Sequence, residues 1–278
     1  MKHQKGDHRG TALITGASSG IGAEYSRQLA AHHYDLILVA RRKKKLEELA
    51  DVLRKTYGIV VKILAADLSR ERDIKKVEQA ITRCRDLTVL INNAGFGTLG
   101  EFADVKLNAS TEMLTVHNTA TVRLTYAVLQ QMRKHGFGRI INIASVAAFM
   151  TPPRGIMYSA TKMFLVSFSK GLQYEEWKNG ISIQAVCPGT THTEFHSAGY
   201  YKKYNKKGSS IPGWAWLNVQ KVVKESLQKA HRRKVIIVPG IVYKLVVPLI
   251  RAPFIGPLLL SMMYSVYKKE HTGRSSER

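Results

Sequence analysis

Short apolar runs alternate along this chain with longer stretches of helical spacing, and this alternation constrains the fold more than any other sequence feature. The apolar runs, which we predict to be strands, are residues 11–15, 35–40, 60–65, 88–92, 139–144, 182–187 and 234–238. The predicted helices are residues 20–33, 43–57, 70–85, 108–135, 156–178 and 219–231. Strands that are apolar along their whole length are buried on both faces, which is typical of a parallel sheet covered by helices.

The connections between these elements favour a doubly wound sheet, because crossovers between parallel strands are right-handed and ligands bind at the carboxyl ends of the strands. The 278 residues suit one large domain, and no repeat or low-complexity linker divides them. We therefore predict a single-domain Rossmann-type α/β fold of about seven strands. It occupies residues 10–240, after a basic tail at 1–9 and before an apolar, then basic, extension at 241–278.

The two cysteines, Cys84 and Cys187, are too few for a disulfide framework, and no His/Cys spacing is typical of zinc. We expect reduced, mostly buried thiols and no bound metal ion. Reduced thiols fit a cytoplasmic compartment. The polar, basic residues 1–10 do not have the pattern of a secretory signal.

The charge balance is strongly basic, with Lys+Arg 43 against Asp+Glu 20 and a formal net charge of +23. Basic patches attract phosphate-bearing partners: nucleotides, coenzyme A-type substrates, nucleic acid or anionic lipid. The alternative is that the lysines are simply solvated surface residues, and for most of them we expect this to hold. Because no helix-turn-helix, zinc finger or RNA-binding motif accompanies the charge, we expect no specific nucleic-acid binding.

A glycine-rich turn, TGASSGIG at residues 15–22, lies between the first predicted strand and the first predicted helix. Glycines at such a junction allow a tight turn and let the backbone approach a pyrophosphate at the helix N-terminus. The spacing is GxxxGxG, so the second glycine comes late in the turn. The predicted nucleotide contacts in this turn are Gly16, Ser18, Ser19, Gly20, Ile21 and Gly22.

The second predicted strand leads into Arg41 and Arg42, at the place where NAD-binding folds commonly carry an acid for the ribose 2′-hydroxyl. A carboxylate repels a 2′-phosphate, whereas a guanidinium binds it with paired hydrogen bonds. The two arginines therefore favour NADP(H) over NAD(H). The alternative is that they only begin a solvated helix.

Tyr158 and Lys162 stand four residues apart, on one face of a predicted helix. A free tyrosine has a pKa near ~10, and a neighbouring ammonium group lowers it toward working pH. Ser145 follows the fifth predicted strand, from where its hydroxyl can reach a substrate oxygen. Such a pair is common by chance on helix surfaces, but its combination with the glycine turn indicates proton transfer beside a bound nucleotide.

Together these motifs resemble the short-chain dehydrogenase/reductase family. The matching elements, in the family's order, are TGASSGIG at 15–22, Asp67, NNAG at 92–95, Asn118, Ser145, YSATK at 158–162 and PGTTHT at 188–193. The resemblance covers residues 10–240. The segments LVARR and ADLS are similar to an NADP(H)-preferring branch that includes 3-ketoacyl reductase-like enzymes, although the substrate does not follow from this.

The resemblance implies a role for each catalytic position. Tyr158 is expected to donate a proton to the carbonyl oxygen, and Lys162 to lower its pKa and bind the nicotinamide ribose. Ser145 is expected to orient and polarise the carbonyl. Asn118 is expected to hold a water that links Lys162 to solvent, although it can also be an ordinary helix asparagine.

The resemblance also implies further cofactor contacts. Asp67 is expected at the adenine, unless it only caps the helix that follows, and Asn93 near the centre of the sheet. Thr190 or Thr193 is expected at the nicotinamide end. With their neighbours, the implied contacts are Asp67, Leu68, Asn93, Ala94, Gly95, Tyr158, Lys162, Pro188, Gly189, Thr190 and Thr193.

Two later segments bear on partners. The aromatic residues Phe195, Tyr200, Tyr201, Tyr204, Trp214 and Trp216 favour an apolar or acyl-type substrate, or else they pack a substrate lid among themselves. Residues 252–267 form an uncharged run of 16 residues, shorter than the ~20 that a spanning helix needs. Flanked by basic residues, this segment can contact a membrane interface peripherally, cover the substrate or join subunits.

These observations predict an NADPH-dependent reductase of ketones, 3-oxoacyl compounds or steroid-like carbonyls. The alternatives are a non-catalytic nucleotide sensor or a membrane-associated scaffold on the same fold, and an epimerase or dehydratase relative. Relatives often pair through the helices that carry Asn118 and Tyr158, so a homodimer or homotetramer stays open.

Overall fold

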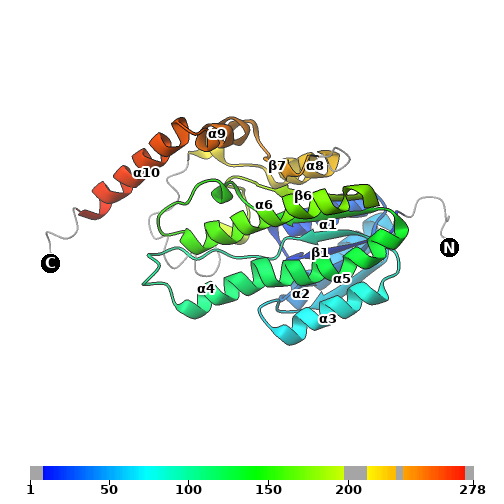
Figure 1. Ribbon diagram of the computed structural model, residues 1–278. Helices are drawn as coiled ribbons and strands as arrows, with labels where there is room; N and C mark the ends of the chain where they lie inside the picture. Colours follow the sequence, from blue (N-terminus) through cyan, green and yellow to red (C-terminus); the bar gives the residue numbers. More distant parts are fainter. Residues whose placement is uncertain (1–8, 197–211, 230–233, 273–278) are drawn as a thin grey trace.

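The computed structural model describes residues 9–196, 212–229 and 234–272. Within these residues seven parallel strands form one sheet, in the order β3-β2-β1-β4-β5-β6-β7 (Figure 1). Their bounds are β1 (Thr11–Thr15), β2 (Asp35–Ala40), β3 (Val61–Ala65), β4 (Leu87–Asn92), β5 (Gly138–Ile143), β6 (Ile181–Val186) and β7 (Ile236–Ile237). The predicted single-domain, doubly wound α/β fold is confirmed.

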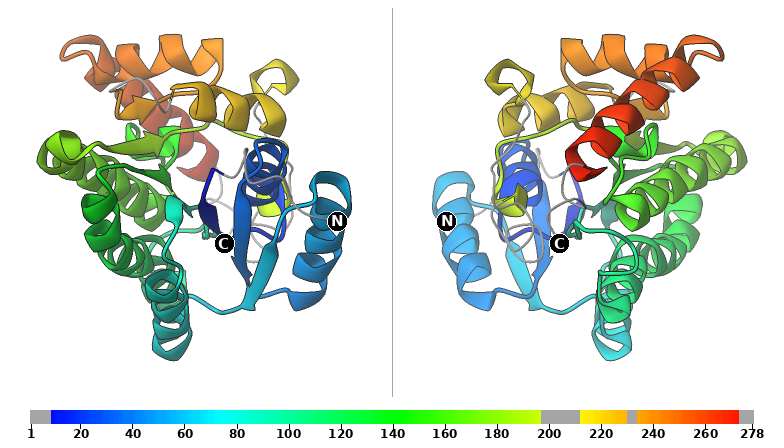
Figure 2. Two further views of the ribbon diagram at one scale, coloured as in Figure 1. Left: turned by 90° about the vertical axis from the view of Figure 1, so that its right-hand side faces the viewer. Right: turned by 90° about the vertical axis from the view of Figure 1, so that its left-hand side faces the viewer.

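Helices cover both faces of the sheet, and Figure 2 shows the two layers on either side of it. The helices α1 (Gly20–Ala31), α2 (Lys43–Tyr57) and α8 (Val219–Lys229) pack on one face, through side chains such as Tyr25, Leu46 and Val223. The helices α3 (Glu71–Arg83), α5 (Ala120–His135) and α6 (Ile156–Glu176) pack on the other. Because both faces are covered, every residue of β1 and β4 is buried.

The predicted long helix at 108–135 is interrupted in the structure. It consists of α4 (Leu107–Leu114), the π-helical segment η1 (Thr115–Thr119) and α5. A π-helical turn carries one extra residue, and this local change was not predicted from the apolar spacing of the sequence. Such turns are frequent at functional sites, and this one carries His117 and Asn118.

The order of the strands reverses between β1 and β4, which lie side by side although three helices and two strands separate them in the sequence. The chain leaves these two strands in opposite directions across the sheet, so the loops that follow them separate and leave a crevice at the carboxyl edge. This crevice is the point to which the glycine turn and the NNAG segment both lead.

Two helices follow the sheet, α9 (Ile241–Arg251) and α10 (Ile255–Thr272), and α10 leads away from the body of the domain (Figure 1). No single helix in the described part of the chain is long and apolar enough to cross a membrane. The pair 241–251 and 255–262 reaches that length and composition only together, with a bend of 106°. The basic tail at 1–8 and the lid residues Tyr200, Tyr201 and Tyr204 lie outside the described residues.

Candidate active site

A cleft of about 1260 Å³ lies at the carboxyl edge of the sheet and collects the residues singled out from the sequence. All of the predicted catalytic and cofactor-binding residues line it except Gly22, which packs against Gly16, and Asn118, which bonds to Thr161; of the predicted substrate-side aromatics in the described residues, Phe195 lines it and Trp214 and Trp216 do not. Those that line it are Gly16, Ser18, Ser19, Gly20, Ile21, Arg41, Arg42, Asp67, Leu68, Asn93, Ala94, Gly95, Ser145, Tyr158, Lys162, Pro188, Gly189, Thr190 and Thr193.

The glycine turn is held tightly against the end of β4. Thr15 Oγ1 accepts hydrogen bonds from the backbone N–H groups of Asn93 (2.9 Å) and Ala94 (3.0 Å), and Asn93 Nδ2 donates to the Thr15 carbonyl at 2.9 Å. Gly16 has φ +65°, and a Cβ there would lie 2.7 Å from Asn93 Nδ2. A Cβ on Gly22 would overlap the Gly16 carbonyl oxygen. The turn therefore presents bare backbone and the N-terminus of α1 to the cleft, which is the arrangement that accepts a pyrophosphate.

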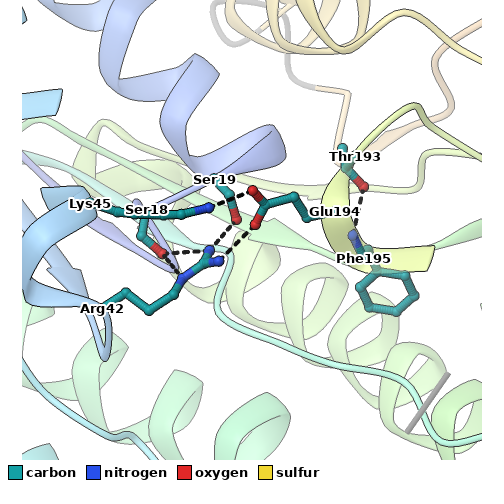
Figure 3. Close-up of polar contacts among 7 residues, drawn as sticks. All are labelled: Ser18, Ser19, Arg42, Lys45, Thr193, Glu194 and Phe195. Atoms are coloured by element: carbon teal, nitrogen blue, oxygen red, sulfur yellow. Dashed lines mark hydrogen bonds and ion pairs between the residues drawn. The ribbon is translucent and has the colours of Figure 1, made fainter. Parts of the chain in front are cut away.

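Arg42 extends across this turn (Figure 3). Its Nη2 donates to Ser18 Oγ at 2.9 Å and to Ser19 Oγ at 2.6 Å, and its Nε donates to Ser18 Oγ at 3.2 Å. Arg41 also lines the cleft. Farther along the same wall, the Asp67 carboxylate accepts the N–H (3.1 Å) and hydroxyl (2.8 Å) of Ser69, so it shapes the turn before α3 as well as facing the cleft.

Tyr158 and Lys162 lie in the first part of α6, and the Lys162 Nζ is 5.5 Å from the centre of the Tyr158 ring. Lys162 is buried and donates a hydrogen bond of 2.9 Å to the carbonyl oxygen of Ile143, at the end of β5. Burial lowers the pKa of Lys162 to about 7. Ser145, two residues beyond β5, accepts the N–H of Ala147 at 3.1 Å, which orients its hydroxyl at the same edge.

The π-helical segment η1 supports this pair from behind. His117 Nε2 accepts the N–H of Phe96 at 3.1 Å, so its proton is on Nδ1, which contacts Thr161 Oγ1 at 2.8 Å. Burial, followed by the charge of Lys162, lowers the pKa of His117 well below its ordinary value, so the ring is neutral. Asn118 Nδ2 donates to the Thr161 carbonyl at 3.0 Å. Its Oδ1 is buried and has no hydrogen-bond partner among the described residues.

Two further aromatic residues line the cleft, one beside Tyr158 and one against the loop after β6. The Phe195 ring lies 5.8 Å from the Tyr158 ring, centre to centre. Tyr243, from α9, packs on Gly189, where a Cβ would overlap its ring. Its hydroxyl accepts the N–H of Thr190 at 3.2 Å and donates to the Ala215 carbonyl at 3.0 Å.

Sequence analysis missed His117 and Tyr243 as parts of this site. A lone histidine beside Asn118 has no motif of its own, and Tyr243 lies beyond the segment that resembles the family. Over the described residues no group of three or more His, Cys, Asp or Glu side chains is placed to hold a metal ion.

Comparison with known proteins agrees with this geometry. The family model for short chain dehydrogenases matches residues 10–202. The chain belongs to the short chain dehydrogenase family. The matched residues contain the glycine turn, Ser145, Tyr158 and Lys162, and they end in the sequence between β6 and α8.

Curated relatives in this family are similar over about two thirds of the chain. The very-long-chain 3-oxoacyl-CoA reductase-A of Danio rerio is 35% identical over 182 residues, which are 64% of this chain and 56% of the relative. The 17-beta-hydroxysteroid dehydrogenase type 3 of Mus musculus is 35% identical over 185 residues, 66% of this chain and 60% of the relative. The inactive hydroxysteroid dehydrogenase-like protein 1 of Rattus norvegicus is 31% identical over 179 residues, which are 64% of this chain and 54% of the relative. The matches thus span little more than half the length of these relatives.

A solved member of the family is similar over nearly the whole chain. The short-chain dehydrogenase from Sphingobium yanoikuyae in complex with NADPH is 32% identical, with a TM-score of 0.75. The match covers 97% of this chain and 96% of that one. The similarity therefore includes the helices that follow the sheet as well as the dinucleotide-binding half.

Proposed function

We propose that this short chain dehydrogenase reduces the carbonyl group of an apolar ketone, 3-oxoacyl or steroid-like substrate to an alcohol, with NADPH as hydride donor. The observation that carries the proposal is that Ser145, Tyr158 and Lys162 line one cleft together with the glycine turn. The oxidoreductases among the relatives support the reaction class. Bound NADPH supplies the hydride, and the protein supplies position and proton transfer.

Tyr158 is the proton donor in this proposal, because its phenol faces the cleft beside a cation. A charged Lys162 stabilises the phenolate that remains after the proton has left, which lowers the barrier to transfer. The Ser145 hydroxyl donates a hydrogen bond to the carbonyl oxygen. This bond strengthens as negative charge develops on that oxygen, so it stabilises the transition state more than the ground state.

In this proposal Asn118 holds a water that links Lys162 to solvent, so that protons can reach the lysine. The support for this role is the buried Asn118 Oδ1, which lacks a protein partner in the described part of the chain. An unsatisfied buried acceptor costs free energy unless a water donates to it. The Asn118 amide is fixed by the Thr161 carbonyl, one residue before Lys162, so Oδ1 lies near the turn of α6 that carries this lysine.

The cofactor would be held by the turn between β1 and α1 at its pyrophosphate and by the 188–193 loop at its nicotinamide end. The bare backbone at Gly16 and Gly22 fits a pyrophosphate, because side chains there would overlap neighbouring atoms. Arg42 fits a 2′-phosphate, since its guanidinium already lies over the Ser18 and Ser19 hydroxyls at the cleft wall. This favours NADP(H) over NAD(H).

The substrate end of the cleft favours an apolar molecule. Phe96, Leu99, Met150 and Phe195 line the cleft, and the Phe195 ring lies beside that of Tyr158. Such side chains stabilise a hydrocarbon body by burial, and few polar groups remain to fix its orientation. The alternative, a non-catalytic nucleotide-binding protein, has one observation in its favour, a relative described as inactive.

Steady-state reduction of a carbonyl panel tests the function. The panel contains medium- and long-chain 3-oxoacyl thioesters, steroids and bulky aromatic ketones, each assayed with NADPH and with NADH. We expect turnover with NADPH, and a loss of kcat of about 10³-fold in Tyr158→Phe with unchanged NADPH binding. No turnover of any substrate, combined with tight NADPH binding, would support the non-catalytic alternative. Activity that survives Tyr158→Phe would contradict the mechanism.

We also propose that α9 and α10 contact an anionic membrane surface. Their exposed apolar side chains are Ile241, Leu245, Leu249, Phe254, Ile255, Leu258 and Met262. Phe254, at the bend between the helices, is 89% exposed. Lys244 and Arg251 lie on α9 beside this apolar surface, and the net charge of the chain complements anionic lipid.

Co-sedimentation with phosphatidylcholine vesicles, with and without phosphatidylserine, tests the membrane contact. We expect the wild-type protein to bind the vesicles that contain phosphatidylserine, and Leu245→Glu with Phe254→Glu to abolish binding. Val52→Glu, at an exposed apolar residue on α2, is the control for added charge. Equal sedimentation of all three proteins would contradict the proposal.

A second copy of the chain is the partner that we propose for α5 and α6. Both helices expose large aromatic residues, among them Tyr126 (71%) and Tyr174 (81%). Light scattering coupled to gel filtration measures the mass directly. A monomer over the whole concentration range would contradict this pairing.

A further inference from the structure

A carboxylate from the loop after β6 occupies the cationic site that we assign to the cofactor's 2′-phosphate. Glu194 lies in the short 3₁₀ turn 194–196, far in sequence from the N-terminus of α2. Its Oε2 lies 2.7 Å from Arg42 Nη1, and its Oε1 lies 2.6 Å from Lys45 Nζ (Figure 3). One carboxylate thus bridges two cations.

The same arginine is held in place by the glycine turn. Arg42 donates to Ser18 and Ser19 through Nε and Nη2, while Nη1 points to Glu194. Figure 3 shows Ser18, Ser19 and Glu194 around the guanidinium group of Arg42, with Lys45 reaching the same carboxylate. The hydrogen bonds from Lys45 and Arg42 lower the pKa of Glu194 to about 2, so the carboxylate is ionised throughout the working pH range.

The chemistry of this bridge matches that of a phosphate monoester. Guanidinium and ammonium groups bind carboxylate and phosphate oxygens by the same charge-assisted hydrogen bonds, so the two anions compete for them. The bridge is also displaceable. Glu194 and Arg42 are each 45% exposed, and ion pairs as exposed as this contribute little net stability.

Displacement of Glu194 would also move its neighbours Thr193 and Phe195, and through Phe195 it would affect Tyr158. Thr193 lies against Gly20 in the glycine turn, where a Cβ would be 3.1 Å from its side chain. Phe195 packs on Tyr158. The three consecutive residues therefore connect the nucleotide turn, the cationic site and the catalytic ring.

We propose that Glu194 is a specificity-determining residue that competes internally with the 2′-phosphate of NADP(H) for Arg42 and Lys45. The inference rests on the proposed use of NADP(H). While Glu194 is bound, it cancels one of the two positive charges of the cationic site, so the site discriminates less between the two cofactors. A 2′-phosphate that displaces it releases the loop that carries Phe195, whereas NAD(H) leaves the bridge in place.

Calorimetric binding of 2′,5′-ADP and of 5′-AMP tests this without catalysis, because the two probes differ only in the 2′-phosphate. We expect Glu194→Gln to bind 2′,5′-ADP about 3- to 30-fold more tightly than the wild type does, which corresponds to the loss of two exposed ion pairs. Binding of 5′-AMP should change less than twofold. The matched control is Glu47→Gln on α2, which removes the same charge from an exposed pair with Lys43.

The outcomes separate this inference from the cofactor proposal. A wild-type preference for 2′,5′-ADP that is unchanged or weaker in Glu194→Gln would overturn the inference and leave NADP(H) use intact. An equal gain for both probes, or the same gain in Glu47→Gln, would also overturn it, because a general charge effect would then explain the result. No preference in either the wild type or Glu194→Gln would overturn both proposals.

Discussion

The ammonium group of Lys162 lies 5.5 Å from the centre of the Tyr158 ring and is fixed there by a hydrogen bond to the carbonyl oxygen of Ile143. Helical spacing alone places the two residues on one face of α6. The carbonyl at the end of β5 adds a second anchor, so the sheet also determines where the cation lies. A buried cation held in this way costs free energy that the fold must offset.

That cost predicts a pH dependence of stability. The folded-state pKa of Lys162, about 7, lies below its ordinary value of 10.5, so between these values the unfolded chain binds more protons. The free energy of unfolding should therefore rise with pH in this window, by at most about 1.4 kcal/mol per pH unit. Below pH 7 Lys162 is charged in both states, and its burial then destabilises the fold fully. Denaturant titrations of the wild type and Lys162→Met from neutral pH to about pH 9 measure the difference. Parallel curves for the two proteins would show that burial does not depress this pKa.

The buried His117 predicts a loss of stability at acidic pH. Its folded-state pKa lies well below 6.5, so below that pH the unfolded chain takes up a proton that the folded protein does not. Stability should fall as the pH is lowered through 6.5, because burial, and then the charge of Lys162, disfavour the protonated ring in the folded protein. His117→Gln, which cannot titrate, should lose less stability on acidification. Urea unfolding at neutral and mildly acidic pH compares them, and an equal loss in both would refute the assignment.

Two glycines should respond oppositely to alanine. A Cβ on Gly22 would overlap the Gly16 carbonyl oxygen and approach Asn93 Nδ2. Because backbone must then move, we expect Gly22→Ala to destabilise the protein by about 3 kcal/mol and to weaken NADP⁺ binding. Gly171, within α6, has nothing within 4 Å of the Cβ position, so Gly171→Ala should stabilise by about 0.5–1 kcal/mol. Thermal unfolding with and without NADP⁺ measures both; a tolerated Gly22→Ala would mean that the turn is looser than the structure shows.

Tyr243→Phe should weaken the loop at the nicotinamide end. The change removes the acceptor for the Thr190 N–H and the donor to the Ala215 carbonyl, at a cost of about 1–2 kcal/mol. We expect weaker NADPH binding and a higher substrate KM. Tyr264→Phe is the matched control, because that hydroxyl donates to the Thr151 carbonyl at the surface of α10. Fluorescence titration with NADPH distinguishes them, and equal affinities would argue against a role for Tyr243.

The glycine turn and the Tyr158–Lys162 pair were predictable because their chemistry depends on short-range spacing. GxxxGxG after an apolar strand and YxxxK on a helix are patterns within one or two elements. The strands were predictable for a similar reason, since burial on both faces leaves an uninterrupted apolar run. The strand β3 is the exception: its sequence VKILA contains a lysine, because β3 lies at the edge of the sheet and is only partly buried.

The remaining parts of the site depend on contacts between distant segments. Glu194 meets Arg42 across 152 residues, and Tyr243 meets Thr190 across 53. No local pattern specifies such pairs. The π-helical turn that carries His117 was not predicted either, because a single extra residue in a helix has no sequence motif of its own.

Tyr243 couples the C-terminal helices to the loop after β6, so the two cannot be exchanged between relatives independently. A chain cut after Gly240 would lose the side chain that clasps Gly189 and Thr190. Shortened proteins are for that reason a poor baseline for studying α9 and α10. A chimaera that takes these helices from a relative would also need that relative's 189–190 loop, because Tyr243 contacts it. The end of the sheet is therefore not the boundary at which segments of this fold can be exchanged.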